Sequence, residues 1–488
     1  MSKKEIESTG IDRNYTPPTL KKLIAMSAGL LVWNMMYTAQ SRIQIYGQKV
    51  LGLDPFTIAF ILMFFTIIDI VNDPILARFS DKTTFFTKKY GKRIALIVIG
   101  NFGMIIFLIL SFIPWELNPG GGLANPEQTI LVVIWICFMI TFWDCAQTFR
   151  EVNNHALLPD LLRDQKSRTK MSLIDTIFGG FIGIALGLIM IPLILSAFNA
   201  FDDTGLVDNP NAFFMMAIIV SVIFLIAIPI EIWGKWEPKE MREFRAKFDE
   251  KIKNPPFFKV IKNAFSDRNW AAFMVSSLQW ALIAKITTVG TDYYVIDGLG
   301  LNIGASMIPQ LALVIGMTIF GIIGYPLLRK FGSKKVFMIG ILISILGFFL
   351  MIFSTSLMTY AFFVFIAAGG VGFQNATRTV MRQQAIDSSI LKHGTRDEAQ
   401  YNAVNGIVRS TSITIQAFIF AIITVIFGYD ATLGYAGNTE LARFGLLFHL
   451  SIVQMVITII AGILIWKLFI ITKPGAVENK EKLLELGR

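Results

Sequence analysis

The sequence predicts an all-α membrane protein in which twelve transmembrane helices form two pseudo-symmetric six-helix bundles, with both termini in the cytoplasm. Three observations lead to this prediction. Of the 488 residues, 54% are hydrophobic and only 16% are charged, whereas about a quarter of the residues of a soluble chain are charged. Apolar runs long enough to cross a bilayer recur along the chain, and basic residues gather in alternate loops between them.

A helix needs about 20 mostly apolar residues to cross about 30 Å of hydrocarbon. The runs that meet this requirement are 23–46, 55–79, 93–115, 130–156, 171–198, 213–233, 270–296, 305–328, 336–353, 360–382, 401–427 and 443–469. They divide the chain into a tail (1–22), a first bundle (23–234), a linker (235–268), a second bundle (269–470) and a second tail (471–488).

The charges between these runs predict the orientation. Basic residues concentrate in the N-terminal tail, after the second, fourth, eighth and tenth runs, and in the linker. The loops "ELNPGGGLANPEQ", "FDDTGLVDNP" and "DGLGLNIG" contain no cation. By the positive-inside rule the tails and the linker face the cytoplasm of a multi-pass plasma-membrane protein. The net charge of +10 is therefore explained by basic loops that orient the chain in the membrane, and we expect no nucleic-acid partner.

Two further features point to a transporter and away from an enzyme. "KKYGKR" after the second run and "RKFGSKK" after the eighth suggest related halves, which are typical of secondary transporters. The ATP-binding pattern GxxxxGK[ST], HExxH and GxSxG are all absent from the sequence. We read the two cysteines, Cys137 and Cys145, as small apolar fillers, and we expect no cofactor. The polar N-terminus is too long to be a cleaved signal.

Acidic residues interrupt the second run. Asp69 and Asp73 are four residues apart and share a helix face, with Asn72 beside them. Each carboxylate at the centre of a spanning helix costs about 2.5–3.5 kcal/mol, so a functional reason is expected. Carboxylate and amide oxygens suit Na⁺ or proton exchange. The alternative is that these groups cap the cytoplasmic end of the helix, a role that fits Asp81 better.

The fourth run ends with a polar stripe. Asp144, Thr148, Glu151 and His155 follow one another at spacings of four, three and four residues, so they share one helix face. Such a stripe faces a cavity or a neighbouring helix rather than lipid. We interpret it as substrate contact, with His155 binding the solute or tuning Glu151. Hydrogen bonding between helices is the alternative interpretation.

Charged and aromatic residues also occur in the seventh and eleventh runs. Lys285 and Asp292 share a face of the seventh run, and Arg409 stands alone in the eleventh. They are candidate substrate ligands or structural ion pairs. Aromatic rings that could stack on a sugar are provided by Trp143, Phe149, Trp280, Tyr293 and Tyr294. Gly179, Gly183 and Gly187 recur every four residues, which indicates close helix packing.

The segment "DIVNDPILARFSDKTTFFTKKYGKR" resembles the span-two signature of the glycoside–pentoside–hexuronide:cation symporters, the melibiose permease group of the major facilitator superfamily. Their pattern is D-x-x-N-D-P, then a G-x-x-x-D loop and W-G-[KR]-x-[KR]-P. The D-x-x-N-D-P core is complete, whereas Ala77, Tyr90 and Ala95 replace the Gly, Trp and last Pro. "ALLPDLLRDQKSRTKM", "DYYVIDGLG" and "HGTRDEAQYNAV" resemble three further segments of these proteins, so the likeness covers most of the chain.

The resemblance implies a major facilitator fold and specific site residues. The sugar would be held by Asp69 and by Glu151, which stands where the family has a shorter Asp. Arg409 is the nearest match to a family Lys on span eleven. The implied ligands of the coupling cation are Asp69, Asn72, Asp73 and Thr148.

Together these features predict a monomeric secondary transporter that carries a sugar or glycoside with Na⁺, or with H⁺, by alternating access. Thr148, His155, Lys285 and Arg409 would complete the substrate contacts of Asp69 and Glu151. Two alternatives are a cation-coupled carrier of a lysolipid or other amphiphile, and a membrane sensor that has lost transport. A channel is disfavoured because no selectivity filter or repeated acidic ring is present. Predicted cytoplasmic gate residues are Asp81, Arg93 and Arg168.

Overall fold

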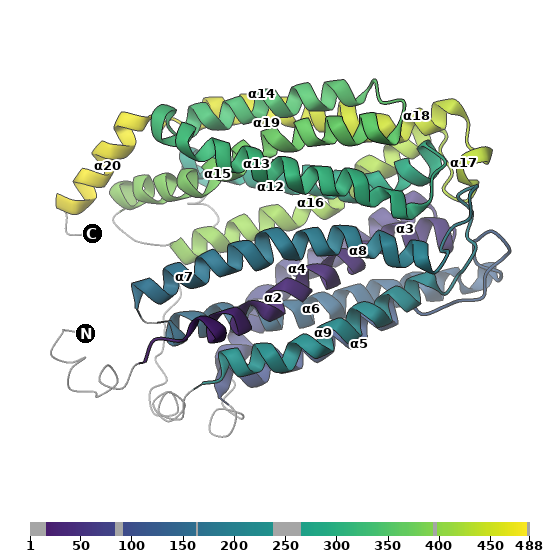
Figure 1. Cartoon of the computed structure of the whole chain (residues 1–488), viewed down its shortest axis with the longest axis horizontal. Helices are drawn as coiled ribbons and strands as arrows, with labels where there is room; N and C mark the ends of the chain where they lie inside the picture. The colour runs from purple at the N-terminus through teal and green to yellow at the C-terminus, as the bar shows by residue number, and fades with distance from the viewer. Residues whose placement is uncertain (1–15, 83–90, 163, 238–264, 394–397, 486–488) are drawn as a thin grey trace.

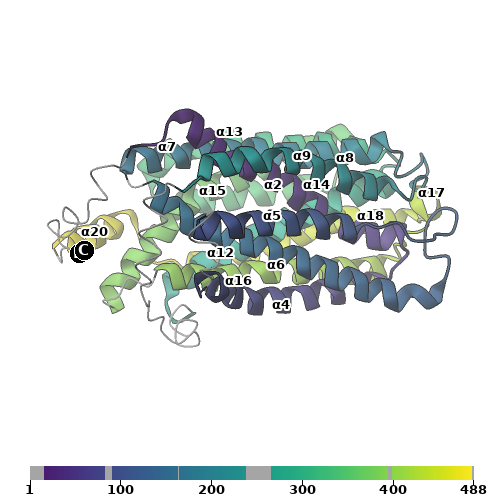
Figure 2. The same ribbon diagram turned by 90° about the horizontal axis from the view of Figure 1, so that it is seen from below.

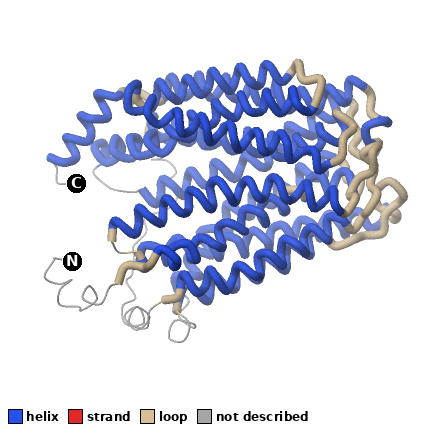
Figure 3. The backbone as a smooth tube through the Cα atoms, viewed as in Figure 1, coloured by secondary structure: helices blue, strands red, loops and turns tan. Residues whose placement is uncertain are grey.

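The computed structural model describes residues 16–82, 91–162, 164–237, 265–393 and 398–485. Nearly all of this described part is helical, and its β pairing is limited to isolated bridges in loops (Figure 3). Most of the predicted linker 235–268 lies outside the described residues. Figure 1 shows two groups of long helices lying side by side, one from each half of the sequence.

The first group contains the helices of the N-terminal half. Short helical segments extend several of the long ones, so that α7, η3 and α8 form one continuous rod. The elements are α2 (Leu20–Gln40), α3 (Ile43–Ile45), η1 (Tyr46–Val50), α4 (Pro55–Lys82), α5 (Lys92–Ser111), η2 (Pro126–Gln128), α6 (Thr129–Leu161), α7 (Gln165–Asp175), η3 (Thr176–Gly183), α8 (Ile184–Ala197) and α9 (Ala212–Lys235).

The second group contains the helices of the C-terminal half, and α20 continues beyond its last long helix. The elements are α12 (Arg268–Tyr293), η4 (Tyr294–Gly298), η5 (Ile303–Ser306), α13 (Met307–Phe331), α14 (Ser333–Met351), α15 (Leu357–His393), α16 (Glu398–Phe427), α17 (Gly434–Gly437), α18 (Glu440–Phe448), η6 (His449–Val453), α19 (Gln454–Leu468) and α20 (Lys473–Glu485).

Within the described residues, 11 helices are long and apolar enough to cross a membrane. They correspond to the predicted runs from 55–79 onward. The remaining predicted run, 23–46, is α2 with its extension through α3. The α2 helix packs against α8 and α9 and carries polar side chains such as Asn34 and Gln40, which lower its hydrophobicity.

Two helices run further than hydropathy predicts. The α15 helix continues to His393, whereas the apolar run ends near residue 382, and α6 continues to Leu161. A helix can continue beyond the hydrocarbon region if its additional turns pack against other parts of the protein. On α15 these contacts are apolar, because Ile386 and Ile390 pack in a cluster with Trp270.

The predicted glycine contacts are confirmed. Gly179 and Gly187 on the α7–α8 rod face α2, where an added Cβ would lie 2.4 Å from Leu30 Cδ2 and 2.6 Å from Thr38 Oγ1. These distances leave no room for a side chain, so the glycines allow the two helices to approach closely. Across the halves, α4 packs along α16, and α8 packs along α13 and η5.

Buried ion pairs join the two halves at the end of the bundle that carries α17 (Figure 2). Lys49 Nζ lies 2.6 Å from Asp297 Oδ2, and both side chains are almost completely buried. Arg42 Nε lies 3.0 Å from Asp292 Oδ2, and Tyr293 donates a hydrogen bond of 2.6 Å to Gln48. This end is therefore closed by polar contacts between the halves.

Candidate transport site

The α4 and α6 helices place polar side chains against one another inside the first bundle. Thr148 on α6 donates a hydrogen bond of 2.8 Å to Asp73 on α4. Asn72 Nδ2 lies 3.4 Å from Asp144 Oδ2 and 3.1 Å from Cys145 Sγ. The four-residue and three-residue spacings on the two helices turn these groups toward a shared interface.

Asp69 lies one turn before Asp73 on α4 and is 9% exposed. Its carboxyl group lies close to that of Asp144, which is 6% exposed. The interface thus collects three acidic side chains, and one of them, Asp144, has no counterpart in the cation ligands implied by the resemblance.

One oxygen at this interface has no partner. The Asn72 Oδ1 atom is buried and accepts no hydrogen bond, a state that costs free energy unless another ligand is bound. Together with the carboxylates of Asp69 and Asp73 and the hydroxyl of Thr148, it offers the hard oxygen donors that Na⁺ prefers. Within the described part of the chain, no three His, Cys, Asp or Glu side chains are arranged as a metal site. A cation here would therefore depend on the amide and hydroxyl oxygens as well.

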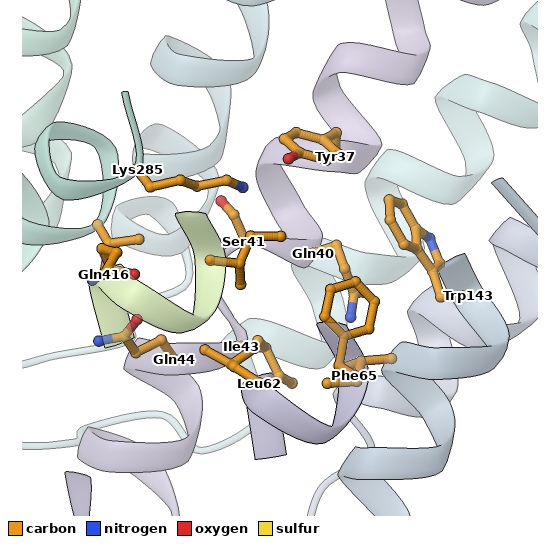
Figure 4. Close-up of a pocket in the computed structure, with 13 residues that line it drawn as sticks. Tyr37, Gln40, Ser41, Ile43, Gln44, Leu62, Phe65, Trp143, Lys285 and Gln416 are labelled. Atoms are coloured by element: carbon orange, nitrogen blue, oxygen red, sulfur yellow. The ribbon is translucent and has the colours of Figure 1, made fainter. Parts of the chain in front are cut away.

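A cavity of about 70 Å³ lies between the two halves (Figure 4). Helices α2, α4 and α6 provide one wall, and α12 and α16 provide the other. Lys285 reaches into it and lies 4.3 Å from the ring of Tyr37. The lining residues are Tyr37, Gln40, Ser41, Ile43, Gln44, Leu62, Phe65, Ile140, Trp143, Lys285, Val289, Ile413 and Gln416.

Several polar atoms around this cavity have no hydrogen-bond partner. They are Gln40 Oε1, Gln44 Nε2, Trp143 Nε1 and Gln416 Nε2, and all four atoms are buried. Buried donors and acceptors are nearly always satisfied in native proteins. These amide and indole groups beside the cavity are therefore available to bind water or a polar ligand.

The cavity and the acidic interface adjoin each other. Trp143 lines the cavity, and the next residue, Asp144, belongs to the acidic interface. On α4, Phe65 lines the cavity and Asp69 lies one turn beyond it. The α4 and α6 helices thus contribute residues to both regions. A displacement of either helix at one region would therefore move residues of the other.

A sequence profile of proteins described as MFS/sugar transport proteins matches residues 25–473. The chain belongs to this family. The match confirms the resemblance drawn from the span-two signature and excludes an enzyme. A raffinose carrier protein from Pediococcus pentosaceus is 27% identical over 181 residues, which are 36% of this chain and 25% of the carrier. The match thus spans a quarter of that relative.

Solved structures confirm the predicted fold. A bacterial homologue of the human lysosomal transporter Spinster has a TM-score of 0.66 at 14% identity, covering 95% of this chain and 99% of its own. The xylose transporter XylE from E. coli, in an inward-open conformation, has a TM-score of 0.60 at 12% identity, covering 95% and 98%. The nucleoside transporter NupG has a TM-score of 0.59 at 14% identity, covering 93% and 100%.

In this member of the family, the other predicted substrate residues lie outside the cavity lining. His155 Nε2 lies 3.5 Å from Glu151 Oε1, and the two side chains are 71% and 46% exposed. Arg409 is exposed, and its guanidinium lies 5.7 Å from the ring of Trp280, which Arg378 also contacts at 4.9 Å. Glu151 lies within electrostatic range of Arg409 across the two halves.

The predicted gate residues make the following contacts. Arg93 Nη1 lies 3.1 Å from Ser80 Oγ and from Asn153 Oδ1, which ties α4, α5 and α6 together. Arg168 Nε donates a hydrogen bond of 2.6 Å to the carbonyl of Leu162. These contacts lie within the first half, and the Asp81 side chain falls outside the described residues.

Sequence reasoning missed the amide groups of the cavity. Gln40 and Gln44 are four residues apart in an apolar run, a spacing that places them on one helix face. Gln416 offers no such signal, because it is the single glutamine of the eleventh run. Asp292, noted on the same face as Lys285, pairs instead with Arg42 from the first half.

Proposed function

We propose that this secondary transporter moves a sugar or glycoside together with Na⁺, with H⁺ as the alternative coupling ion. The observation that carries the proposal is the contact between two sites of different chemistry. An oxygen-rich acidic interface with a buried, unpaired Asn72 oxygen adjoins a cavity lined by unpaired amides. A cation fits the first, and a polyhydroxylated solute fits the second.

The coupling ion would act by offsetting charge repulsion. Asp69, Asp73 and Asp144 approach one another at the α4–α6 interface, and like charges in a medium of low dielectric repel strongly. A bound Na⁺ would neutralise part of this charge and accept the free electron pair of Asn72 Oδ1. It would also hold α4 against α6 through Thr148, so that Trp143 keeps its place in the cavity.

The solute would then satisfy the unpaired groups of the cavity. Sugar hydroxyls can donate to Gln40 Oε1 and accept from Gln44 Nε2 and Gln416 Nε2, and the rings of Tyr37 and Trp143 offer apolar faces for the sugar ring. Gln40 and Gln44 belong to the first half and Gln416 to the second. A bound solute would therefore join the halves, as alternating access requires.

The proposal is tested first without a solute, by the thermal unfolding of purified protein in Na⁺ and in choline. A ligand at a hundred times its dissociation constant adds about 2.7 kcal/mol to the native state. We expect Na⁺ to raise the unfolding temperature of the wild type and to have no such effect on Asp73→Asn. The matched control is Asp203→Asn, which removes an exposed loop carboxylate and should keep the Na⁺ response.

Uptake into proteoliposomes completes the test. A Na⁺ gradient should drive accumulation of a labelled sugar, and Asp73→Asn should abolish accumulation. If uptake ignores Na⁺ and collapses with the pH gradient, H⁺ is the coupling ion. If the protein binds sugar but never accumulates it, the transport proposal is wrong and a sensor role gains support. If sugars do not compete with a labelled lysolipid, the amphiphile carrier is favoured.

A further inference from the structure

Figure 1 shows α20 leaving the second bundle at the end expected to face the cytoplasm. Hydrogen bonds between helix ends bring basic residues together at this end. They come from the beginnings of α12, α14 and α20 and from the ends of α13 and α19. We call this set the basic patch, and it consists of Arg268, Arg329, Lys330, Lys334, Lys335, Lys467 and Lys473.

Hydrogen bonds to backbone carbonyls hold the patch together. Lys334 Nζ donates to the carbonyl of Trp466 at 2.8 Å and lies 4.6 Å from the centre of that ring. Arg268 Nη2 donates to the carbonyl of Lys467 at 3.1 Å. Lys473 Nζ donates to the carbonyl of Arg329 at 2.8 Å. The charges are thus fixed near one another instead of being free to separate.

The basic patch makes no salt bridge among the residues that the structure describes. Along the chain, Asp267 accepts a hydrogen bond from the amide of Trp270 and is the acid next to Arg268, whereas Glu478 pairs with Lys482. Lys334 and Lys335 also lie in the first turn of α14, where a positive charge opposes the helix dipole. An anionic partner would relieve both effects.

The surroundings of the patch indicate a lipid rather than a free anion. Trp466 is 56% exposed beside Lys334, and aromatic side chains of this kind gather at the headgroup level of a bilayer. Below it, α14 and α19 pack together and expose Leu342, Leu346 and Ile463. Exposed apolar side chains on the two helices that carry the basic residues suit acyl chains below an anionic headgroup, whereas a soluble phosphate would make no contact with them.

We propose that the basic patch binds the headgroup of an anionic phospholipid, with Lys334, Lys467 and Arg268 around the phosphate and the acyl chains along α14 and α19. The inference is independent of the transported solute and of the coupling ion. Such a lipid would tie together the ends of α12, α14 and α19 in the second bundle.

The test uses the full-length protein reconstituted in phosphatidylcholine vesicles with or without phosphatidylglycerol. Retained lipid is counted by native mass spectrometry after extraction into detergent. The variant is Lys334→Gln with Lys467→Gln, since glutamine can keep the hydrogen bond to the Trp466 carbonyl. The matched control is Lys166→Gln with Lys170→Gln, two exposed lysines on α7 in the first bundle.

We expect the wild type and the control to retain phosphatidylglycerol in preference to phosphatidylcholine. Each lysine near an anionic surface contributes roughly fivefold to binding, so the patch variant should retain about twenty-five-fold less phosphatidylglycerol. A charge-preserving variant, Lys334→Arg with Lys467→Arg, should behave as the wild type, which separates lost charge from misfolding.

Three results would overturn the proposal. The wild type could retain the two lipids equally, or the patch variant and the α7 control could lose phosphatidylglycerol to the same degree. Either result would show that no specific site exists at the patch. If glycerol phosphate at constant ionic strength displaces the lipid from the patch, the site recognises the free anion and the lipid assignment is wrong.

Discussion

The ion pair between Lys49 and Asp297 joins the two halves, so its loss should change the conformation of the protein. Lys49 belongs to η1 in the first half and Asp297 to η4 in the second, and their side chains are 1% and 0% exposed. Asp297 also accepts a hydrogen bond from Tyr429, and Lys49 Nζ donates to the carbonyl of Ala431 at 3.0 Å. We therefore choose Asp297→Asn, which removes the negative charge at nearly constant volume.

The expected magnitude follows from burial. Removing one partner of a buried ion pair costs about 3–5 kcal/mol, because the remaining charge is buried without compensation. This cost applies only while the halves touch, since Lys49 becomes hydrated when they separate. The equilibrium should therefore shift toward a form open at the α17 end by roughly two to three and a half orders of magnitude, at 1.4 kcal/mol per tenfold.

The assay is pulsed electron paramagnetic resonance on spin labels at Glu127→Cys in η2 and Thr355→Cys before α15, two exposed positions in different halves. Cys137 and Cys145, which are the chain's two cysteines, are first replaced by alanine. Asp297→Asn should add a population with a longer distance between the labels. Replacing Lys49 by methionine in the same chain removes the uncompensated charge and should restore much of the short distance.

A matched control separates this effect from general destabilisation. Glu231 lies 2.9 Å from Arg150 and also bonds Lys235, and this buried ion pair lies wholly within the first half. Glu231→Gln should therefore lower the unfolding temperature without changing the distance between the labels. An unchanged distance distribution in Asp297→Asn, together with a lowered unfolding temperature, would refute the gate role of the Lys49–Asp297 pair.

Three further predictions concern the site and the helix packing. Thr148→Val should lower the apparent Na⁺ affinity, measured from the Na⁺-induced rise in unfolding temperature, by about tenfold or more. The reason is that a hydrogen bond to a charged group contributes about 1.5–3 kcal/mol. An unchanged affinity would remove Thr148 from the cation site. Gln44→Leu should stabilise the empty protein in a thermal melt, because it removes a buried unpaired donor, yet weaken sugar binding in an equilibrium assay; a loss of stability would mean that Gln44 is structural. Gly234→Ala should lower stability by about 1–3 kcal/mol, because its Cβ would lie 2.5 Å from the amide nitrogen of Met26, whereas Gly406→Ala, which meets nothing within 4 Å, should not; equal melting temperatures would contradict the close packing of α2 and α9.

Hydropathy predicted the helices well where lipid contact decides their length. The predicted run 213–233 became α9 (Ala212–Lys235), because nearly every residue between its ends is apolar. Hydropathy did not predict the end of α15, because the last turns of that helix are stabilised by contacts with other helices, and these contacts leave no local sequence pattern. The same limit applies to α2, whose polar residues are tolerated because neighbouring helices cover them.

The site was predictable only within each helix. Spacing places Asp69 and Asp73 on one face of α4, and the resemblance to a symporter family adds Thr148, which lies 2.8 Å from Asp73. Spacing also places Asp144 on the polar stripe of α6, but it cannot reveal that this carboxyl group meets Asn72 and Asp69. Contacts between helices depend on how the helices are rotated and shifted, and one sequence contains no direct record of either.

Contacts between the halves were the least predictable and explain most about the mechanism. Lys49 and Asp297 are 248 residues apart, and Lys49 lies at the end expected to face outward, where the positive-inside rule predicts few cations. Its pairing explains the exception. A buried ion pair adds little net stability, because the cost of desolvating both charges offsets most of their attraction. When the halves separate, hydration of the two charges offsets much of the attraction that is lost. Exposing an equal apolar area would instead cost about 25 cal/mol per Å², with no compensating interaction with water. Polar pairs such as Lys49–Asp297 and Arg42–Asp292 therefore suit a seal that must open and close in every transport cycle.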